Sequence, residues 1–443
     1  MKVSLFYLPS VGNKAQIEQG RVGLKGELYD QMLHEISEQA KLADHLGYDS
    51  MSFTEHHFHV EGFEMSNNPV LLDLYIAMQT KRLRVGQLGI VLPTQNPIRV
   101  AEDIAMLDHM SGGRANAGFA RGYQRRWVDI MAQQTHGIHG ALPNQHDEID
   151  AANRAAFEEN FRIIKQAWTQ DFSSYQGKYW RIPAGDTPWT LEATKLWGGG
   201  VENGVVKAVS VVPKPVQKPH PPLWVACSRR ETIHLAAKLG IGALTFAFIS
   251  PEEAKQWVND YYTTLANECE PIGYAINANI AIVTGFMCDK DEQRARAMGE
   301  EGLNFFSYAL GHHYFFGQHE VGKTNIWNNF KNNKFQMPGM GGEAACVGTP
   351  DKIRAKLREY EDVGVDQVVF ISQAGKNKHE DICSSLNLFG KEVLPEFKDR
   401  EQQNAKKKAE RLAPIIENAM KRKRQPNVPK HDGPTIVTAA PLP

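Results

Sequence analysis

The stretch from Val85 to Arg121 is the sequence feature that most restricts the fold of this chain. It begins with an apolar run that ends at Pro93, passes through Asn96-Pro97 into an amphipathic helical pattern, and turns at Ser111-Gly112-Gly113 into a second short strand. Arg121 follows this second strand directly. Strand, helix and strand in this order form the unit of parallel α/β folds, in which ligands bind beyond the strand ends.

The same alternation continues along most of the chain. Helical patterns with a single apolar stripe, such as Leu33, Ile36 and Ala40, separate short runs that are almost continuously apolar. Such runs are typical of parallel strands that are covered on both faces. The candidate strands are Val3–Leu8, Ser50–Thr54, Leu83–Val91, Arg114–Gly118, Leu223–Ala226, Ala243–Phe248, Asn279–Met287 and Gln367–Ile371. Eight strands that alternate with helices predict a (β/α)₈ TIM-like barrel, and an open doubly wound sheet is the alternative.

Two regions interrupt the alternation, at about residues 133–204 and 302–346. On a barrel spanning residues 1–397, we expect both to be long insertions at the active-site face, because loops of this length in compact domains are usually functional or disordered. Residues 398–443 carry eleven Lys and Arg against five Asp and Glu. We expect this segment to be a basic, partly disordered C-terminal extension with one helix, Asn404–Met420.

The composition excludes several classes of protein. Hydrophobic residues make up 42% and charged residues 23% of the 443 residues, as in a globular protein with a large core. The formal net charge is only -1, so we expect neither nucleic acid nor a membrane as a partner. The five cysteines lack a CxxC pair, the N-terminus lacks a cleavable signal pattern, and no segment approaches about 18 consecutive apolar residues. We therefore expect a cytoplasmic protein.

A cluster of ionisable side chains follows the second candidate strand. It contains Glu55, His56 and His57, and His59 comes two residues later. Residues just past the end of a barrel strand face the active site, and a histidine there can transfer a proton near neutral pH. Adjacent histidines on an extended segment point to opposite sides, so we expect no metal site. The alternative is that one or two of these histidines bond buried backbone.

A second cluster lies where another candidate strand opens into a helix. Ser228, Arg229 and Thr232 bring hydroxyl and guanidinium groups to the helix N-terminus, where free N–H groups favour a phosphate. Arg121 and Gly122, at the end of the fourth candidate strand, add a further cation that can make two hydrogen bonds to a phosphate. The alternative is an ordinary capped helix with solvated arginines.

The sequence contains one nucleotide-binding pattern and lacks another. Residues 317–324 satisfy the GxxxxGK[ST] spacing of a P-loop, but a short aromatic segment precedes them where a buried strand is required, so we do not expect nucleotide binding there. No GxGxxG follows a candidate strand. The absence of this dinucleotide-binding pattern favours a reduced cofactor that is supplied by a separate protein.

Several ordered motifs give the chain a resemblance to a known family. It resembles the bacterial luciferase-like flavin-dependent monooxygenases over Met1 to Phe397, and the catalytic luciferase subunit most closely over residues 50–240. The motifs that carry the resemblance are Glu55-His56-His57-Phe58, the run Val85–Gln134, Lys218–Ala226, and Cys346–Pro350 leading into Gly364–Gln367. The resemblance implies a TIM-like barrel that binds flavin, often as a dimer.

The resemblance also implies roles for individual residues. Arg121, Ser228 and Thr232 would hold the phosphate of FMN, with Gly122 and Arg229 beside them. His56 would assist at the reacting face of the flavin with Glu55 and His57, while Tyr123 and Trp127 would line the substrate pocket. The chain departs from luciferase at Ala120, where luciferases carry a reactive cysteine, and at Cys227, which replaces an acidic residue. The first departure argues against a light-emitting enzyme.

The implied function is a monooxygenase that takes reduced FMN from a separate NAD(P)H:flavin reductase. Reaction with O₂ to a C4a-hydroperoxide would then oxygenate a small apolar organic substrate, and the chain would form a homodimer. Three alternatives remain. They are an F420-dependent oxidoreductase of the same superfamily, a non-catalytic flavin-binding protein and, remotely, a P-loop nucleotide hydrolase.

Overall fold

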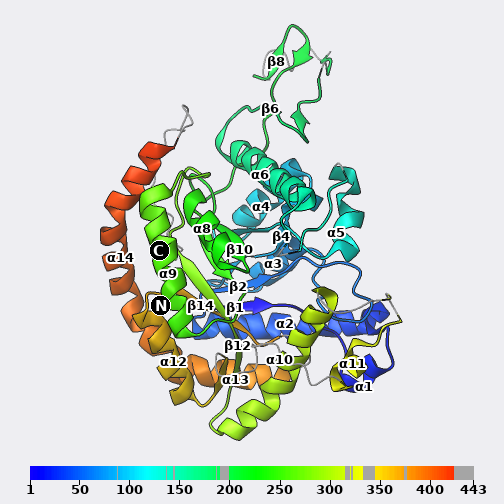
Figure 1. The fold of residues 1–443 in the computed structure, drawn as a ribbon, viewed down its shortest axis with the longest axis vertical. Coiled ribbons are helices and arrows are strands. Elements are labelled where there is room, and N and C mark those ends of the chain that lie inside the picture. Colours follow the sequence, from blue (N-terminus) through cyan, green and yellow to red (C-terminus); the bar gives the residue numbers. More distant parts are fainter. Residues whose placement is uncertain are drawn as a thin grey trace.

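The computed structural model of the chain describes residues 1–86, 88–135, 137–142, 145–185, 187–189, 199–314, 320, 323–332, 345–373 and 377–423. Its centre is a sheet of parallel strands surrounded by helices (Figure 1). The strands of this sheet are β1 (Lys2–Tyr7), β2 (Ser50–Phe53), β3 (Arg84–Val85), β4 (Ile90–Val91), β5 (Ala117–Ala120), β10 (Leu223–Cys227), β11 (Gly242–Thr245), β12 (Ile280–Cys288), β13 (Cys346–Gly348) and β14 (Gln367–Ile371). Every candidate strand of the sequence overlaps one of them.

The sheet closes into a barrel. Its strand order is β3-β2-β1-β14-β12-β11-β10-β5-β4, with β13 paired to β12 outside this path. The two ends of the order, β3 and β4, are consecutive parts of one short stretch of chain, and Val85 forms a parallel bridge with Ala115 just before β5. Counting β3 and β4 as one staggered strand gives eight positions around the barrel, which confirms the predicted (β/α)₈ fold.

Local sequence explains where helix α4, which connects β4 to β5, starts and stops. The Asn96 side chain accepts hydrogen bonds from the backbone N–H groups of Ile98 and Arg99, and Pro97 occupies the first turn of α4 (Pro97–Met110). The buried face of α4 includes Val100 and Ile104. The glycines that follow Ser111 have positive φ and end the helix.

Helices cover the outside of the barrel (Figure 1). Besides α4 they are α2 (Gly26–Leu46), α3 (Pro69–Ala77), α6 (Glu148–Thr169), α8 (Arg230–Leu239), α9 (Pro251–Glu268), α10 (Glu292–Tyr314), α12 (Pro350–Asp362), α13 (His379–Glu392) and α14 (Leu394–Arg422). Within the described residues, no helix combines the length and the apolar character needed to cross a membrane.

The regions predicted as insertions contain regular structure. The first holds α6 and two short hairpins, β6–β7 (Tyr175–Gln176 with Arg181–Ile182) and β8–β9 (Val201–Glu202 with Val205–Val206), which project away from the barrel (Figure 1). In the second, α10 continues to Tyr314 and α11 (Ile326–Asn332) follows. The functional role and the boundaries of these insertions stay a prediction.

Helix α14 crosses the predicted boundary at residue 398 without a break. It contains the predicted helix Asn404–Met420 and is longer at both ends. Its basic residues contact the barrel: Lys408 Nζ lies 2.7 Å from a carboxylate oxygen of Asp366, and Arg422 donates a hydrogen bond to the carbonyl of Ala266 at the end of α9. Residues 424–443, where we expect disorder, lie outside the described part of the chain.

Candidate active site

Three of the predicted groups follow strands of the same parallel barrel. The histidines come after β2, Arg121 to Trp127 after β5, and Ser228 to Thr232 after β10. Parallel strands end on one side of a barrel, and β5 lies beside β10 with Phe119 opposite Val225. The segments that carry the two halves of the predicted anion site therefore begin at the ends of neighbouring strands.

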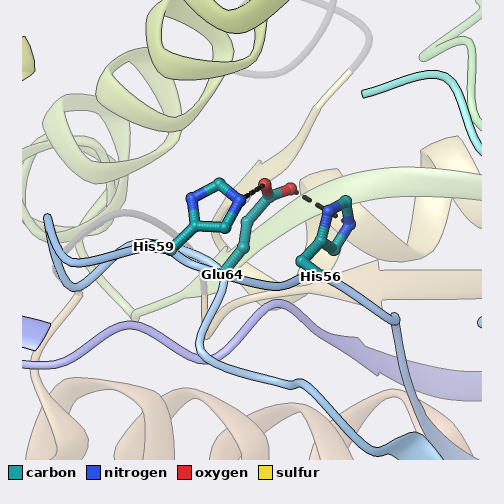
Figure 2. A group of neighbouring side chains, drawn as sticks. All are labelled: His56, His59 and Glu64. Carbon is teal, nitrogen blue, oxygen red and sulfur yellow. Dashed lines mark ion pairs between the residues drawn. The ribbon is translucent and has the colours of Figure 1, made fainter. Parts of the chain in front are cut away.

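Two histidines converge on one buried carboxyl group after β2. His56 Nε2 lies 3.3 Å from Oε1 of Glu64, and His59 Nε2 lies 3.5 Å from Oε2 of the same residue (Figure 2). We call His56, His59 and Glu64 the histidine–Glu64 cluster. Gln124 links it to the loop after β5, because its amide donates to Glu64 Oε2 over 3.1 Å and its oxygen contacts His59 Nε2 over 3.2 Å.

The predicted pocket residues lie around His56. The ring centroids of Tyr123 and Trp127 are 6.5 and 6.3 Å from that of His56, in edge-on arrangements. His57 packs on the other side of Trp127, with 4.8 Å between the ring centroids. The structure thus brings together His56, His57, Tyr123 and Trp127 as one group of rings at the carboxyl end of the barrel.

Burial controls the charges in this group. It lowers the pKa of His56 to about 3, so the imidazole is neutral near pH 7. Burial also raises the pKa of Glu64 to about 8, so this carboxyl group holds a proton at neutral pH. A neutral histidine next to a neutral carboxylic acid places no charge in the apolar surroundings.

Glu55 is held differently from Glu64. Its carboxylate accepts hydrogen bonds from the backbone N–H of Val91 at 2.7 Å and from the Gln95 side chain at 2.6 Å, and it lies 3.2 Å from His57 Nε2. Both oxygens are therefore engaged in joining the end of β4 to His57. This arrangement suits a positioning role, whereas we expected Glu55 to take part in the chemistry.

Asp150 on α6 forms ion pairs with two arginines, Arg121 after β5 and Arg154 on α6 itself. Its two oxygens lie 2.7 Å from Arg121 Nη1 and 3.1 Å from Arg154 Nη2. Desolvation opposes ionisation of Asp150, but the hydrogen bonds from Arg121 and Arg154 outweigh it, and its pKa falls below the usual value. One carboxylate facing two guanidinium groups leaves a net positive charge here.

The start of α8 completes the anion-binding arrangement. Arg229 Nε is buried and has no hydrogen-bond partner among the described residues, and the exposed Ser228 precedes it. Both residues line an open hollow of about 590 Å³, together with Arg230, with Ser250 at the start of α9 and with two acidic residues, Glu231 and Glu253. The Thr232 hydroxyl, by contrast, donates to the Arg229 carbonyl over 2.5 Å, which fits the alternative of an ordinary helix cap.

Gly122 permits the turn after Arg121. Its φ is +75°, and a Cβ at this position would lie 2.5 Å from Val91 Cγ1. Any larger residue would therefore push the loop away from β4. Gly122 shapes the site through its backbone, as expected for a residue that lets the chain pass close to a ligand.

The structure also bears on two sites that we do not expect, a metal site and a P-loop. The ligand-type atoms of the histidine–Glu64 cluster lie within 4.8 Å of one another, close enough to consider a metal ion, although the same atoms already contact Gln124. The absence of a metal stays a prediction. The segment before the P-loop pattern is helix α10, and Lys323 forms an ion pair with Glu320 at 2.7 Å. Most of that pattern lies outside the described residues.

Sequence reasoning missed four residues of this site, which are Glu64, Gln124, Asp150 and Arg154. Glu64 follows the noted histidines within eight positions, so its place in the same loop was the available signal. Gln124 had no signal, because its contact depends on how two separate loops meet. Arg154 is four residues after Asp150 on one helix face, a spacing that pairs opposite charges.

These observations describe an α/β barrel with a neutral histidine and several arginines in the segments that follow the carboxyl ends of its strands. The family model described as luciferase-like monooxygenase matches residues 1–367. The chain therefore belongs to the luciferase-like monooxygenase family, in agreement with the motifs noted in the sequence. Its members are oxidoreductases.

Individual relatives agree with this assignment. The oxygenase component of the flavin-dependent trigonelline monooxygenase of Acinetobacter baylyi is 24% identical over 378 residues, covering 84% of this chain and 91% of the relative. The alkanal monooxygenase alpha chain of Photorhabdus luminescens is 23% identical and covers 82% and 91%, respectively. Both alignments therefore extend over most of each protein.

Solved structures share the fold. The oxygenating constituent of 3,6-diketocamphane monooxygenase from Pseudomonas putida, in complex with FMN, superposes with a TM-score of 0.62 at 18% identity, covering 89% of this chain and 98% of that chain. An F420-dependent tetrahydromethanopterin reductase from Methanopyrus kandleri gives 0.55 at 19% identity, covering 90% and 100%. At these identities the likeness supports the barrel fold alone.

Proposed function

We propose that this protein is the oxygenase component of a two-component flavin-dependent monooxygenase. In this proposal a separate NAD(P)H:flavin reductase supplies reduced FMN, and the enzyme uses it with O₂ to oxygenate a small apolar organic substrate. The observation that carries the proposal is the buried Arg229 Nε, which lacks an acceptor among the described residues, together with Arg121 after the neighbouring strand β5 and the neutral His56 after β2. The names of the flavin-dependent relatives support the choice of cofactor.

The residues fit the phosphate of FMN. Arg229 Nε is a buried donor that lacks an acceptor in the described part of the chain, and a phosphate oxygen would supply one. Arg121 is oriented by Asp150 through one N–H group, and among the described residues its other four N–H groups are available for further acceptors. Ser228 adds a hydroxyl donor at the N-terminus of α8, where the helix dipole also favours a negative charge.

The bound reduced flavin would supply the electrons with which O₂ is activated. The protein's own residues provide the surroundings for this chemistry. Trp127 is 1% exposed and packs with Tyr123 and His57 around His56, which excludes water from that side. His56 is neutral at neutral pH, so it can form or release a hydrogen bond without a large change in local charge.

An anaerobic titration with reduced FMN, followed by rapid mixing with O₂, tests the proposal. We expect saturable binding and a flavin oxidation that is slower on the protein than in free solution, because the site excludes water. Absence of binding, or oxidation at the rate of free flavin with stoichiometric H₂O₂, would contradict it. Addition of a candidate substrate should then lower the yield of H₂O₂.

A second candidate cofactor is F420, because solved structures with this fold include two F420-dependent enzymes. The same anaerobic titration with reduced F420 separates the two. Binding of F420 without binding of FMN would make the protein a hydride-transfer enzyme.

We also propose that the enzyme is a homodimer and that α3 and α4 form its interface. The two helices are neighbours and expose large apolar side chains to solvent. These side chains are Leu71, Tyr75, Met78, Met106 and Met110, which are between 38% and 68% exposed. Spacings of three and four residues place them along one face of each helix. Burial of this face against a second copy would remove it from water.

A further inference from the structure

Glu64 is a carboxyl group that the proposed flavin site does not explain. Its side chain is fully buried, and its backbone adopts φ +53°, in the left-handed region that non-glycine residues rarely occupy. The loop after β2 therefore directs this acid into the protein interior rather than to the surface. A buried acid in a strained backbone position calls for a structural reason.

The two oxygens of Glu64 have different surroundings. Oε2 accepts an N–H of Gln124 at 3.1 Å and lies 3.5 Å from His59 Nε2. Oε1 lies 3.3 Å from His56 Nε2, yet no described N–H or O–H group donates an aligned hydrogen bond to it. An acceptor oxygen without a donor is unfavourable in the interior, whereas a protonated Oε1 is itself a donor.

The charged and titratable groups around Glu64 favour its neutral form. Arg126 is the cation that faces it, but Arg126 is ion-paired with Glu61 at 2.9 Å. Tyr123 faces it with a hydroxyl whose pKa is raised by burial and by Glu64 itself. His59 lies on the Oε2 side, and the Glu55–His57 pair lies beyond His56.

A proton on Glu64 belongs on Oε1, because Oε2 already accepts from Gln124. Nε2 of His56 is the acceptor within reach of that proton. A neutral imidazole carries one proton, so if Nε2 accepts, the proton of His56 must be on Nδ1. His56 Nδ1 is buried and has no hydrogen-bond partner among the described residues.

We propose that Glu64 is a positioning residue that donates a hydrogen bond from Oε1 to His56 Nε2 and thereby holds His56 in the tautomer with its proton on Nδ1. His56 then presents a hydrogen-bond donor, and not a base, to a molecule bound beside it. Only this last consequence rests on the proposed function. The tautomer itself is a property of the protein without flavin.

The proposal makes the tautomer dependent on pH. When Glu64 loses its proton, the carboxylate accepts from His56 Nε2, and the imidazole proton moves from Nδ1 to Nε2. His56 thus changes from a donor to an acceptor at Nδ1 as the pH rises through the pKa of Glu64, about 8.

In the conservative variant Glu64→Gln, the orientation of the new side-chain amide is determined by its neighbours. Gln124 still donates to the atom at the Oε2 position, so that atom must be the amide oxygen of the new glutamine. The amide nitrogen then faces His56 Nε2 and donates to it, as the protonated acid does. This variant should keep the Nδ1–H tautomer at every pH at which the protein is folded.

Long-range ¹H–¹⁵N spectra of the flavin-free protein, labelled with ¹⁵N-histidine, report the tautomer directly. His56 is assigned by the signals that disappear in His56→Asn. We expect the Nδ1–H form of His56 in the wild type at pH 7, its conversion to the Nε2–H form above about pH 8, and no conversion in Glu64→Gln. Because no flavin is present, failure of FMN binding leaves this result unaffected.

Three results would overturn the proposal. The first is the Nε2–H tautomer in the wild type at pH 7, and the second is the same pH-dependent conversion in Glu64→Gln. The third is a simultaneous shift of the His56 and His59 nitrogens with one equivalent of Zn²⁺, which Glu64→Gln abolishes. This third result would make the histidine–Glu64 cluster a metal site. The spectrum of the wild type at pH 7 is enough to determine the tautomer of His56. The test therefore remains decisive even if a variant does not fold.

Discussion

Burial of Glu64 links the stability of the protein to pH. The pKa of this acid rises from an ordinary value near 4.5 to about 8 in the folded state, because the charged form loses its hydration there. Its contribution to stability is therefore fully present below about pH 4.5 and is lost as the pH rises through about 8.

His56 affects the free energy of unfolding in a different pH range. Its pKa falls to about 3, so its contribution is present above about pH 6.5 and is lost at acid pH.

Glu64→Gln should therefore remove an alkaline loss of stability. We expect the free energy of unfolding of the wild type to fall between pH 7 and pH 9, and that of the variant to fall much less. Urea unfolding at the two pH values measures this difference, and Glu410→Gln on the exposed face of α14 is the matched control. Parallel slopes in the wild type and Glu64→Gln would show that Glu64 is ionised when folded.

At the scale of elements, the strand pattern was predictable and its interruptions were not. All eight candidate strands occur in the barrel because continuous apolar runs between helical patterns are specific for buried parallel strands. The run Leu83–Val91, however, divides into β3 and β4. Gly89 explains the break, since its φ is +126° and a Cβ there would lie 2.3 Å from the carbonyl oxygen of Phe53. Apolar periodicity contains no information on such a close backbone approach.

Gly89→Ala should accordingly destabilise the barrel. The substitution combines an unfavourable φ with a collision against backbone that cannot move aside, so we expect a loss of more than about 1 kcal/mol. Gly112→Ala is the control, because Gly112 also has positive φ, +65°, but nothing lies within 4 Å of the point that a Cβ would occupy there. Urea unfolding curves compare the two. An equal loss in both variants would assign the effect to φ alone.

The site was predictable where it depends on single strand ends. His56 and Arg121 follow strands, and the geometry of a barrel brings such residues to one end. Gln124, Asp150 and Arg154 complete the site through the loop after β5 and through α6, whose path over the barrel the sequence does not encode in any short pattern. Contacts between separate connections require the folded structure.

At the scale of the whole molecule, the exposed apolar face of α3 and α4 predicts the state of assembly. Leu71→Glu combined with Met78→Glu should convert the dimer into a monomer, because two buried charges at one interface are strongly unfavourable. Light scattering coupled to size exclusion measures the molar mass. Val212→Glu is the control, since Val212 is 64% exposed and lies in another part of the chain. A monomeric wild type, or a variant that stays dimeric, would contradict this interface.

We propose above all that the arginines following the carboxyl ends of β5 and β10 bind the phosphate of reduced FMN. The most direct test of this proposal is the dissociation constant of reduced FMN, measured anaerobically for the wild type, Arg121→Ala and Arg99→Ala. Arg99 is exposed on α4 and pairs with Glu102 outside the site, so it controls for the general loss of a positive charge. We expect Arg121→Ala to weaken binding by at least about 1.5 kcal/mol, roughly tenfold, and Arg99→Ala to leave it unchanged. Unchanged affinity in a folded Arg121→Ala protein would contradict the account.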